Sequence, residues 1–410
     1  PMRDHQRYYP VRNEDGSLMP YFLTVRNGGT KAIHNVQIGN ERVLRARLDD
    51  AKFFFENDRK KSLEGHREDL TRINYQEGMG TMLDKADRLQ KLSDFICDGW
   101  NLSADEKADA ERAAYLSKSD LATGMVTEFT ELQGEMGKEY ALLDGEKKNV
   151  AQAIFEQYMP RFAGDILPQE SIGRVLSMAD KLDNLAATFL RGLIPTGSQD
   201  PFALRRQTIG AVNILTDGGI HWDIREGIRK ALELLPGEKE AKETALGQIE
   251  EFFRQRIKAI MLDEGIAYDI IDAVLAGPVD DIEALFLKAR AMAESQLKDE
   301  TDLRQAVTRL ANITKDKEGG AVDPSLFEVE YEKNLQAALD EVKAEVLPLY
   351  KEYQYGKALA SLKKLTAPIN DYLDNVMVMV DDEKVKANRV SQLISALDLF
   401  RAWGDFSKLV

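Results

Sequence analysis

Cysteine, histidine and long apolar runs are scarce in this sequence, and each shortage argues against a class of protein. Cys97 is the single cysteine, so the chain forms no internal disulfide, and this usage suits a reducing, cytoplasmic location. No apolar run approaches the roughly 20 residues of a membrane-spanning helix, so we expect no membrane partner. Only four of the 410 residues are histidines, which leaves little imidazole for metal binding or acid–base catalysis.

An excess of positive charge is also missing. The 55 Lys and Arg residues face 70 Asp and Glu residues, for a formal net charge of −15. Proteins that bind nucleic acids are usually basic, so this balance argues at first against such a partner, and we expect no DNA partner. Residues 351–410 are locally different, because their seven Lys and two Arg against eight Asp and Glu give 9 − 8 = +1.

The order of sequence patterns predicts a mainly α fold with a short β-containing segment at the N-terminal end. Residues 1–45 hold two β-prone runs around Asp15-Gly16, a hairpin signal, and we interpret them as the tail of an upstream domain. The opening Pro-Met-Arg-Asp suggests a fragment of a longer chain. Helical spacing of apolar residues then predicts a helical domain over 46–235 and a helical connector over 236–314. The stretch KDKEGGAVDPS (315–325) predicts a linker into a last helical domain, 315–410.

Two segments resemble the helical core of HD-type phosphohydrolases: SKSDLATGMVTEFTELQG and SMADKLDNLAATF. Such sites hold a metal with two histidines and two aspartates, and Asp120 and Asp180 would be the aspartates here. Ser119 stands where the His-Asp pair has its histidine, and no histidine lies between residues 67 and 220. We therefore interpret Asp120 and Asp180 as helix-end or ion-pair carboxylates, and expect neither a metal site nor a catalytic residue. A metal-dependent nucleotide phosphohydrolase remains an alternative.

One lone histidine also allows a metal-site hypothesis. His221 precedes a predicted helix start and forms a His-x-Asp pair with Asp223. A single histidine beside Trp222 is more typical of a packed structural residue, and we prefer that interpretation.

The stretch PTGSQDPFALRR (195–206) has the features of a phosphate-binding turn. Asp200 followed by Pro201 predicts a helix start, and Arg205 and Arg206 then share a face with Phe202. A buried guanidinium needs an anionic partner, because removing it from water alone is costly. Two partners stay open: the carboxylates of Asp180 and Asp183, or a nucleic-acid phosphate. No Gly-Lys-Ser/Thr follows Gly197, so the stretch is not a nucleotide P-loop.

Long motifs over most of the chain resemble the β subunit of bacterial tetrameric glycyl-tRNA synthetase. The C-terminal motif also resembles the anticodon-binding helical domain of arginyl-tRNA synthetases. The motifs are GNERVLRARLDDAKFFFENDRK (39–60), GMGTMLDKADRL (78–89), KSDLATGMVTEFTELQGEMGKEYA (118–141), QAIFEQYMPRFAGD (152–165), SMADKLDNLAATFLRGLIPTGSQDPFALRRQTIGAVNIL (177–215) and TAPINDYLDNVMVMVDDEKVKANRVSQLISALDLF (366–400). Two departures from the family pattern are Tyr372-Leu373-Asp374, where Phe-Phe-Asp is usual, and Lys386 in place of an arginine. Both keep size or charge.

The resemblance implies a cytoplasmic heterotetramer with divided labour. The α subunit would activate glycine with ATP and Mg²⁺, and this chain would hold tRNA(Gly), so its partners would be tRNA(Gly) and the α subunit. The chain itself would bind no cofactor, and its HD-like domain would be degenerate. A non-catalytic helical scaffold is the remaining alternative. The candidate tRNA-binding residues are Arg205, Arg206, Tyr355, Lys357, Lys363, Lys364, Arg389 and Arg401.

Overall fold

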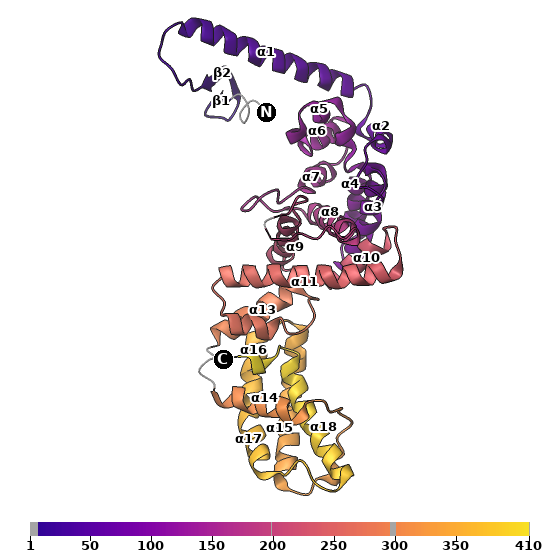
Figure 1. Cartoon of the computed structure of the whole chain (residues 1–410), viewed down its shortest axis with the longest axis vertical. Helices are drawn as coiled ribbons and strands as arrows, with labels where there is room; N and C mark the ends of the chain where they lie inside the picture. The colour runs from indigo at the N-terminus through magenta and orange to yellow at the C-terminus, as the bar shows by residue number, and fades with distance from the viewer. Residues whose placement is uncertain (1–6, 198, 296–300, 410) are drawn as a thin grey trace. The chain divides into compact units, whose positions relative to one another are not determined.

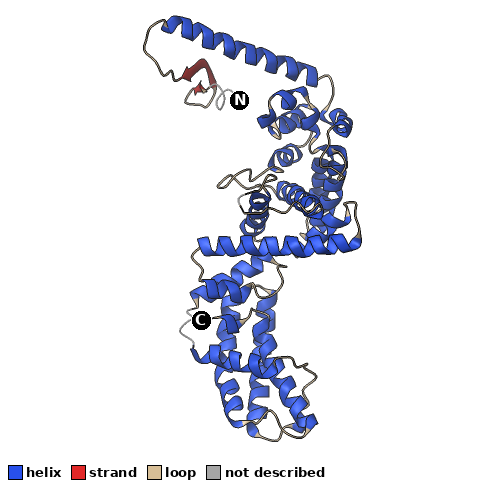
Figure 2. Ribbon diagram, viewed as in Figure 1, coloured by secondary structure: helices blue, strands red, loops and turns tan. Residues whose placement is uncertain are grey.

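The computed structural model describes residues 7–197, 199–295 and 301–409 of the chain, and its elements are labelled in Figure 1. Helices dominate the described residues, and one two-stranded sheet accompanies them (Figure 2), which confirms the predicted mainly α class. The chain divides into two compact units. Unit 1 comprises Pro1–Ile194 with Lys230–Lys242, and unit 2 comprises Pro195–Arg229 with Glu243–Val410. None of the helices in the described ranges is long and apolar enough to span a membrane.

Unit 1 opens with the predicted hairpin. Strands β1 (Tyr8–Arg12) and β2 (Leu18–Thr24) pair antiparallel, with Tyr8 opposite Thr24. The turn depends on Gly16, whose φ of 84° is a conformation that glycine adopts without steric cost. Helix α1 (Ile33–Asp58) follows and runs across the expected boundary at residues 45–46.

The body of unit 1 is a cluster of helices around a central one. They are α2 (Leu63–Arg67), α3 (Met82–Gly99), α4 (Ala104–Leu116), α5 (Gly124–Glu128), α6 (Glu135–Leu143), α7 (Lys148–Glu156) and α8 (Ser171–Leu190), with 3₁₀ turns η2 (Glu68–Arg72), η3 (Ser119–Ala122) and η4 (Thr130–Leu132). Helix α8 packs against α3, α4 and α7 and is buried on nearly every side. A helix enclosed in this way belongs to the core, so Asp180, Lys181 and Asp183 on α8 are held inside the protein.

Helices α3 and α4 begin with the same kind of side-chain cap. Thr81 accepts the backbone N–H of Asp84, and the Asp84 carboxylate accepts the backbone N–H of Thr81. Ser103 and Glu106 repeat this reciprocal arrangement at α4. Such capping boxes satisfy amide groups that a helix start leaves without partners.

Unit 2 is helical throughout its described part. Its helices are α9 (Leu204–Gly218), α12 (Tyr268–Val274), α13 (Ile282–Glu294), α14 (Thr301–Thr314), α15 (Glu330–Lys351), α16 (Tyr355–Leu362), α17 (Thr366–Asn375) and α18 (Glu383–Arg401), with 3₁₀ turns η6 (Pro324–Leu326), η7 (Lys363–Leu365) and η8 (Phe406–Lys408). Helices α10 (Ile224–Glu233) and α11 (Lys239–Asp263) contribute residues to both units.

The C-terminal bundle is larger than the predicted domain 315–410. Helix α14 packs on α17 and α18, so it is part of the bundle, although we expected it in the connector. The predicted linker is also held against α18. The backbone N–H of Gly320 donates to Ser391 Oγ at 2.9 Å, and that of Asp323 donates to Asn388 Oδ1 at 2.7 Å.

The segment after α18 is fixed to α12 by a close backbone approach. Asp405 N donates to the carbonyl oxygen of Ala273 at 2.9 Å. A Cβ atom at the preceding Gly404 would lie 2.8 Å from that same oxygen, which is closer than side-chain carbons come to a backbone carbonyl.

We predict that Gly404→Ala destabilises unit 2 by about 1–3 kcal/mol, because the added methyl group must displace backbone atoms. Thermal unfolding of the whole chain measures this. Gly356→Ala is the matched control, because a Cβ there meets nothing within 4 Å and alanine favours helix α16 by up to about 1 kcal/mol. A Gly404→Ala chain that melts like wild type would contradict the close approach.

Candidate functional sites: a buried charge cluster and the C-terminal cations

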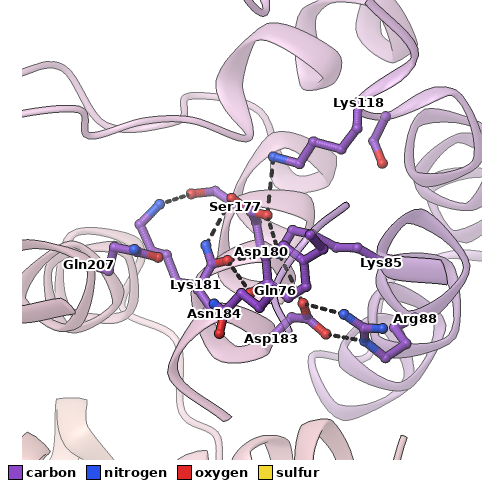
Figure 3. Close-up of polar contacts among 12 residues, drawn as sticks. Gln76, Lys85, Arg88, Lys118, Ser177, Asp180, Lys181, Asp183, Asn184 and Gln207 are labelled. Carbon is purple, nitrogen blue, oxygen red and sulfur yellow. Dashed lines mark hydrogen bonds and ion pairs between the residues drawn. The ribbon is translucent and has the colours of Figure 1, made fainter. Parts of the chain in front are cut away.

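Five charged side chains meet inside unit 1, at the place where an HD-type metal site was considered. Lys85 and Arg88 come from α3, Asp180 and Asp183 from α8, and Lys118 from the residue before η3 (Figure 3). Each pair on a helix is three residues apart, which places both members on one face. All five residues are less than 10% exposed.

Ion pairs join these five side chains in one continuous network. Lys85 Nζ lies 3.0 Å from Asp180 Oδ1 and 2.9 Å from Asp183 Oδ2. Lys118 Nζ lies 3.1 Å from the same Asp180 oxygen. Arg88 binds Asp183 through two bonds, from Nε to Oδ1 at 2.7 Å and from Nη2 to Oδ2 at 3.2 Å. Each buried carboxylate therefore faces two cations (Figure 3).

Aromatic rings line the cations of this network. The Lys85 ammonium lies 4.6 Å from the centroid of the Tyr75 ring, and the Lys118 ammonium lies 4.0 Å from that of Tyr158. Ring faces attract cations, so they offset part of the lost hydration. Burial raises the pKa of Tyr75 to about 12, which keeps its hydroxyl protonated, and that hydroxyl donates to Asn184 Oδ1 at 2.8 Å.

The ionic partners decide the pKa shifts of Asp180, Asp183 and Lys85. Burial alone would raise the pKa of both carboxylates, but Lys118 and Lys85 hold the pKa of Asp180 below its usual value, and Lys85 and Arg88 do the same for Asp183. Burial opposes the charge of Lys85, yet Asp180 and Asp183 outweigh it and raise the pKa of that ammonium. Both aspartates are therefore ionised in the folded protein.

Asp120 lies near Lys118 but is held mainly by a backbone hydrogen bond. Its Oδ2 accepts the backbone N–H of Gly134, the residue at the start of α6, at 2.6 Å. Burial raises its pKa. The interpretation of Asp120 as a helix-end carboxylate and of Asp180 as an ion-pair carboxylate is confirmed.

The cluster is unsuited to divalent metal chemistry. A metal site needs carboxylate oxygens with free lone pairs, usually with imidazole nitrogen beside them. Here ammonium and guanidinium groups already occupy the carboxylates of Asp180 and Asp183. In the described ranges no group of three or more His, Cys, Asp or Glu side chains lies close enough to hold a metal ion. The protein's own cations supply the charge that balances these aspartates.

One of the two partners considered for Arg205 and Arg206 was wrong. Asp180 and Asp183 are neutralised by Lys85, Arg88 and Lys118, while Arg206 is exposed and Arg205 half-buried on α9. The phosphate alternative stays a prediction.

The helix expected from Asp200-Pro201 also begins later than predicted, at Leu204. Asp200 reaches forward to accept the backbone N–H groups of Leu204 and Arg205 at 2.8 and 3.0 Å, and Ala203 takes a left-handed conformation with φ of 54°. Asp200 therefore still satisfies the first amides of α9, but across a turn of non-helical residues.

The candidate cations of the C-terminal bundle differ in exposure. Lys357 and Lys364 are exposed, Arg401 is exposed, and Lys363 is half-buried. Lys364 Nζ lies 2.6 Å from Glu345 Oε1, and Arg401 Nη1 lies 3.1 Å from Asp398 Oδ1. Exposed pairs of this kind contribute little to stability, so a phosphate could replace the carboxylate.

Two candidate RNA contacts are core residues instead. Arg389 is 4% exposed and donates to Glu332, Glu328 and the carbonyl of Met377 at 2.8, 2.8 and 3.0 Å. Tyr355 is 6% exposed and packs edge-on against Trp403, with ring centroids 5.5 Å apart. Both side chains are buried for the same reason, because pairing over long sequence separations covers side chains that look available in the sequence, and their contact with RNA stays a prediction.

His221 has the structural role that we expected. Its ring stacks on Tyr353 at 3.3 Å between centroids, and Nδ1 lies 2.9 Å from Asp281 Oδ2. One ring face and one nitrogen are thus tied to side chains within unit 2, which confirms the packed interpretation.

Family comparisons agree with this division into two kinds of helical body. A family model described as glycyl-tRNA synthetase beta subunit matches residues 1–276. This chain belongs to the glycyl-tRNA synthetase β-subunit family. A second model, the DALR anticodon binding domain, matches residues 303–401, which covers α14 to α18 and confirms an anticodon-binding type of domain in the bundle.

Curated relatives support the same family. The chain is 45% identical over 411 residues to the glycine–tRNA ligase β subunit of Clostridioides difficile, covering all of this chain and 59% of the relative. It is 42% identical over 418 residues to that of Desulforamulus reducens, covering all of this chain and 60% of the relative. The chain thus spans about three fifths of the length of these β subunits.

Within this family assignment, the cations of the charge cluster are residues that we did not single out from the sequence. Lys85 and Arg88 in the motif DKADRL carry two cations one helical turn apart, and Asp180 and Asp183 in ADKLDNL carry two anions at the same spacing. Complementary pairs on otherwise apolar helices are a signal for a buried network. Lys118 had no such local signal, because it lies in a turn with φ of 66°.

We predict that Lys85→Met destabilises unit 1 by about 3–5 kcal/mol, because it leaves Asp180 and Asp183 buried with one cation fewer. Lys91→Met is the matched control, since Lys91 is exposed on the same helix. Calorimetric melting of the chain checks this. If both variants had the melting temperature of wild type, the network would have no stabilising role.

Proposed function

We propose that this chain is the tRNA-binding part of a glycine–tRNA ligase β subunit, and that it holds tRNA(Gly) for aminoacylation by the α subunit. The observation that carries the proposal is the anticodon-binding domain match over 303–401, on a bundle that follows a β-subunit family match over 1–276. An anticodon-binding domain in this family serves to hold and identify one tRNA.

The division of labour is the one that the family resemblance implies. ATP, Mg²⁺ and the chemical step belong to the α subunit, the partner in a cytoplasmic heterotetramer. The buried carboxylates of unit 1 are consistent with this assignment, because lysine and arginine already engage them.

In tRNA binding, the contacts that position the RNA differ from the contacts that identify it. Contacts with phosphates fix the RNA on the protein, and contacts with unpaired bases identify it. Lys357, Lys363, Lys364 and Arg401 are cations of the bundle that can supply phosphate contacts, and Arg206 is a further one on α9. A net charge of −15 would otherwise repel RNA, so these local cations must act at short range.

We predict that the chain binds tRNA(Gly) more tightly than an unrelated tRNA, with an affinity that falls steeply as salt increases, because phosphate contacts release counterions. Lys357→Glu should weaken binding by about tenfold, or ~1.4 kcal/mol, and lower the salt slope by about 1 without changing the melting temperature. Filter binding over a salt series measures both quantities.

Lys91→Glu is the control, because it makes the same charge change at an exposed position of α3 in unit 1. If both tRNAs bound equally weakly, the result would contradict the proposed function and favour the helical-scaffold alternative. A wild-type chain that turns over nucleotides with a bound metal would instead favour the phosphohydrolase alternative.

A further inference from the structure

The hairpin and the first part of helix α1 form a segment of unit 1 with almost no core of its own. Of the described residues 7–50, Tyr8 is the one buried side chain, at 7% exposed. Its ring lies 5.0 Å from that of Phe22, and its hydroxyl donates to Asn40 Oδ1 at 3.1 Å, which places the hairpin against α1 (Figure 1). Ordering so many residues costs conformational entropy, and one buried ring offsets little of it. The segment therefore needs packing that the described part of this chain does not supply.

The side of the hairpin that faces away from Tyr8 is apolar. Successive side chains of a strand point to opposite faces, so Tyr9 lies on this side with Leu23, its partner in the strand register. Tyr21 precedes Leu23 by two residues in β2 and shares the same side. We call Tyr9, Tyr21 and Leu23 the outer face, and Tyr21 and Leu23 are 64% and 65% exposed. An antiparallel sheet with water on one side carries polar residues there, so an apolar outer face is typical of a sheet that is covered on both sides.

Helix α1 adds an apolar stripe to this surface. Ile33, Leu44, Leu48 and Phe55 are spaced by whole helical turns, so they share one side of α1. At the C-terminal end this side is covered, because the Phe55 ring packs 5.7 Å from that of Tyr140 in α6. Nearer the hairpin, Ile33 and Leu48 are exposed and Leu44 is half-buried. The stripe is thus partnered within the helical body at one end only.

The hairpin also leaves both of its edges open. Strands β1 and β2 pair with each other, and within the described ranges no third strand pairs with either of them. The outward N–H and C=O groups of an edge strand readily pair with a further strand. A two-stranded hairpin is marginal in water and becomes stable with more strands or a helix packed against it. The outer face has no cation for a phosphate, so these features select a protein that supplies β-strands and not an RNA.

The length of the relatives indicates the source of such a partner. All of this chain matches 59% of the Clostridioides difficile β subunit and 60% of that of Desulforamulus reducens. About two-fifths of those β subunits therefore has no counterpart in this chain. A partner within the same polypeptide acts at a high effective concentration, so it occupies a surface ahead of a separate protein that makes similar contacts.

We propose that the outer face and the exposed part of the α1 stripe dock the remaining two-fifths of the β subunit, which adds strands to the hairpin and covers Leu23. The proposal rests on membership of the β-subunit family and does not require tRNA binding. Helix α1 then belongs to two bodies. Its first half packs on the strand-bearing body, and its last turns pack on α5 and α6 of the helical body. One continuous helix thereby joins the two bodies in place of a flexible linker.

The test compares Leu23→Thr in this chain and in the β subunit at the full length of its relatives. Threonine keeps the β propensity of the strand, so the hairpin itself is not weakened. In this chain the melting temperature should change by less than about 1 °C, because Leu23 is mostly exposed, whereas in the full-length subunit it should fall by about 4–8 °C. Leu347→Thr is the control, since Leu347 is an exposed leucine of α15 and its effect should be the same in both polypeptides.

Hydrogen exchange of the wild-type polypeptides gives a second measure that needs no variant. Peptides that cover β1 and β2 should exchange at least about tenfold more slowly in the full-length subunit than in this chain, because their edge amides gain partners. Equal exchange and equal melting in the two polypeptides would overturn the inference. Protection that required the α subunit, or that rose with the concentration of this chain alone, would also overturn it, since the occupant would then be the α subunit or a second copy. Each of these results would leave the proposed function intact.

Discussion

Unit 1 depends on the neutralisation of two aspartates on helix α8, which is buried on nearly every side. Asp180 and Asp183 face the interior because α8 is surrounded by α3, α4 and α7. An ionised carboxylate in that position requires a cation of matching geometry, and Lys85, Lys118 and Arg88 provide it. A metal ion could meet the same charge requirement, but it would also bring Lewis acidity. Ammonium and guanidinium groups neutralise the charge without that chemistry.

The two units use their charges in opposite ways. Unit 1 buries a network that fixes its helices, while the C-terminal bundle leaves Lys357, Lys364 and Arg401 at the surface. The bundle has its own internal pair, Arg389 with Glu332, whose side chains are 5% and 0% exposed. Buried pairs hold the scaffold rigid, and exposed cations remain able to change partners.

Sequence reasoning found what local patterns and long motifs encode, and missed what distant contacts decide. Asp15-Gly16 predicted the hairpin, because few residue types adopt the positive φ that such a turn requires. Helical spacing predicted the mainly α class, and the C-terminal motif predicted the anticodon-binding type of domain. The core positions of Arg389 and Tyr355 were missed, because Glu332 lies 57 residues from Arg389. The start of α9 was misplaced, because Asp200 accepts the amides of the fourth and fifth residues after it, whereas a capping side chain usually accepts those of the second or third.

The most direct test of the account is calorimetric titration of metal-free chain with Mn²⁺ and with Mg²⁺, since both ions favour carboxylate ligands. If lysine and arginine already occupy the buried carboxylates, neither ion will give saturable heat, and the melting temperature will be the same in either ion and in chelator. The account would be contradicted by one ion bound per chain with a raised melting temperature, if Asp180→Asn abolished that binding.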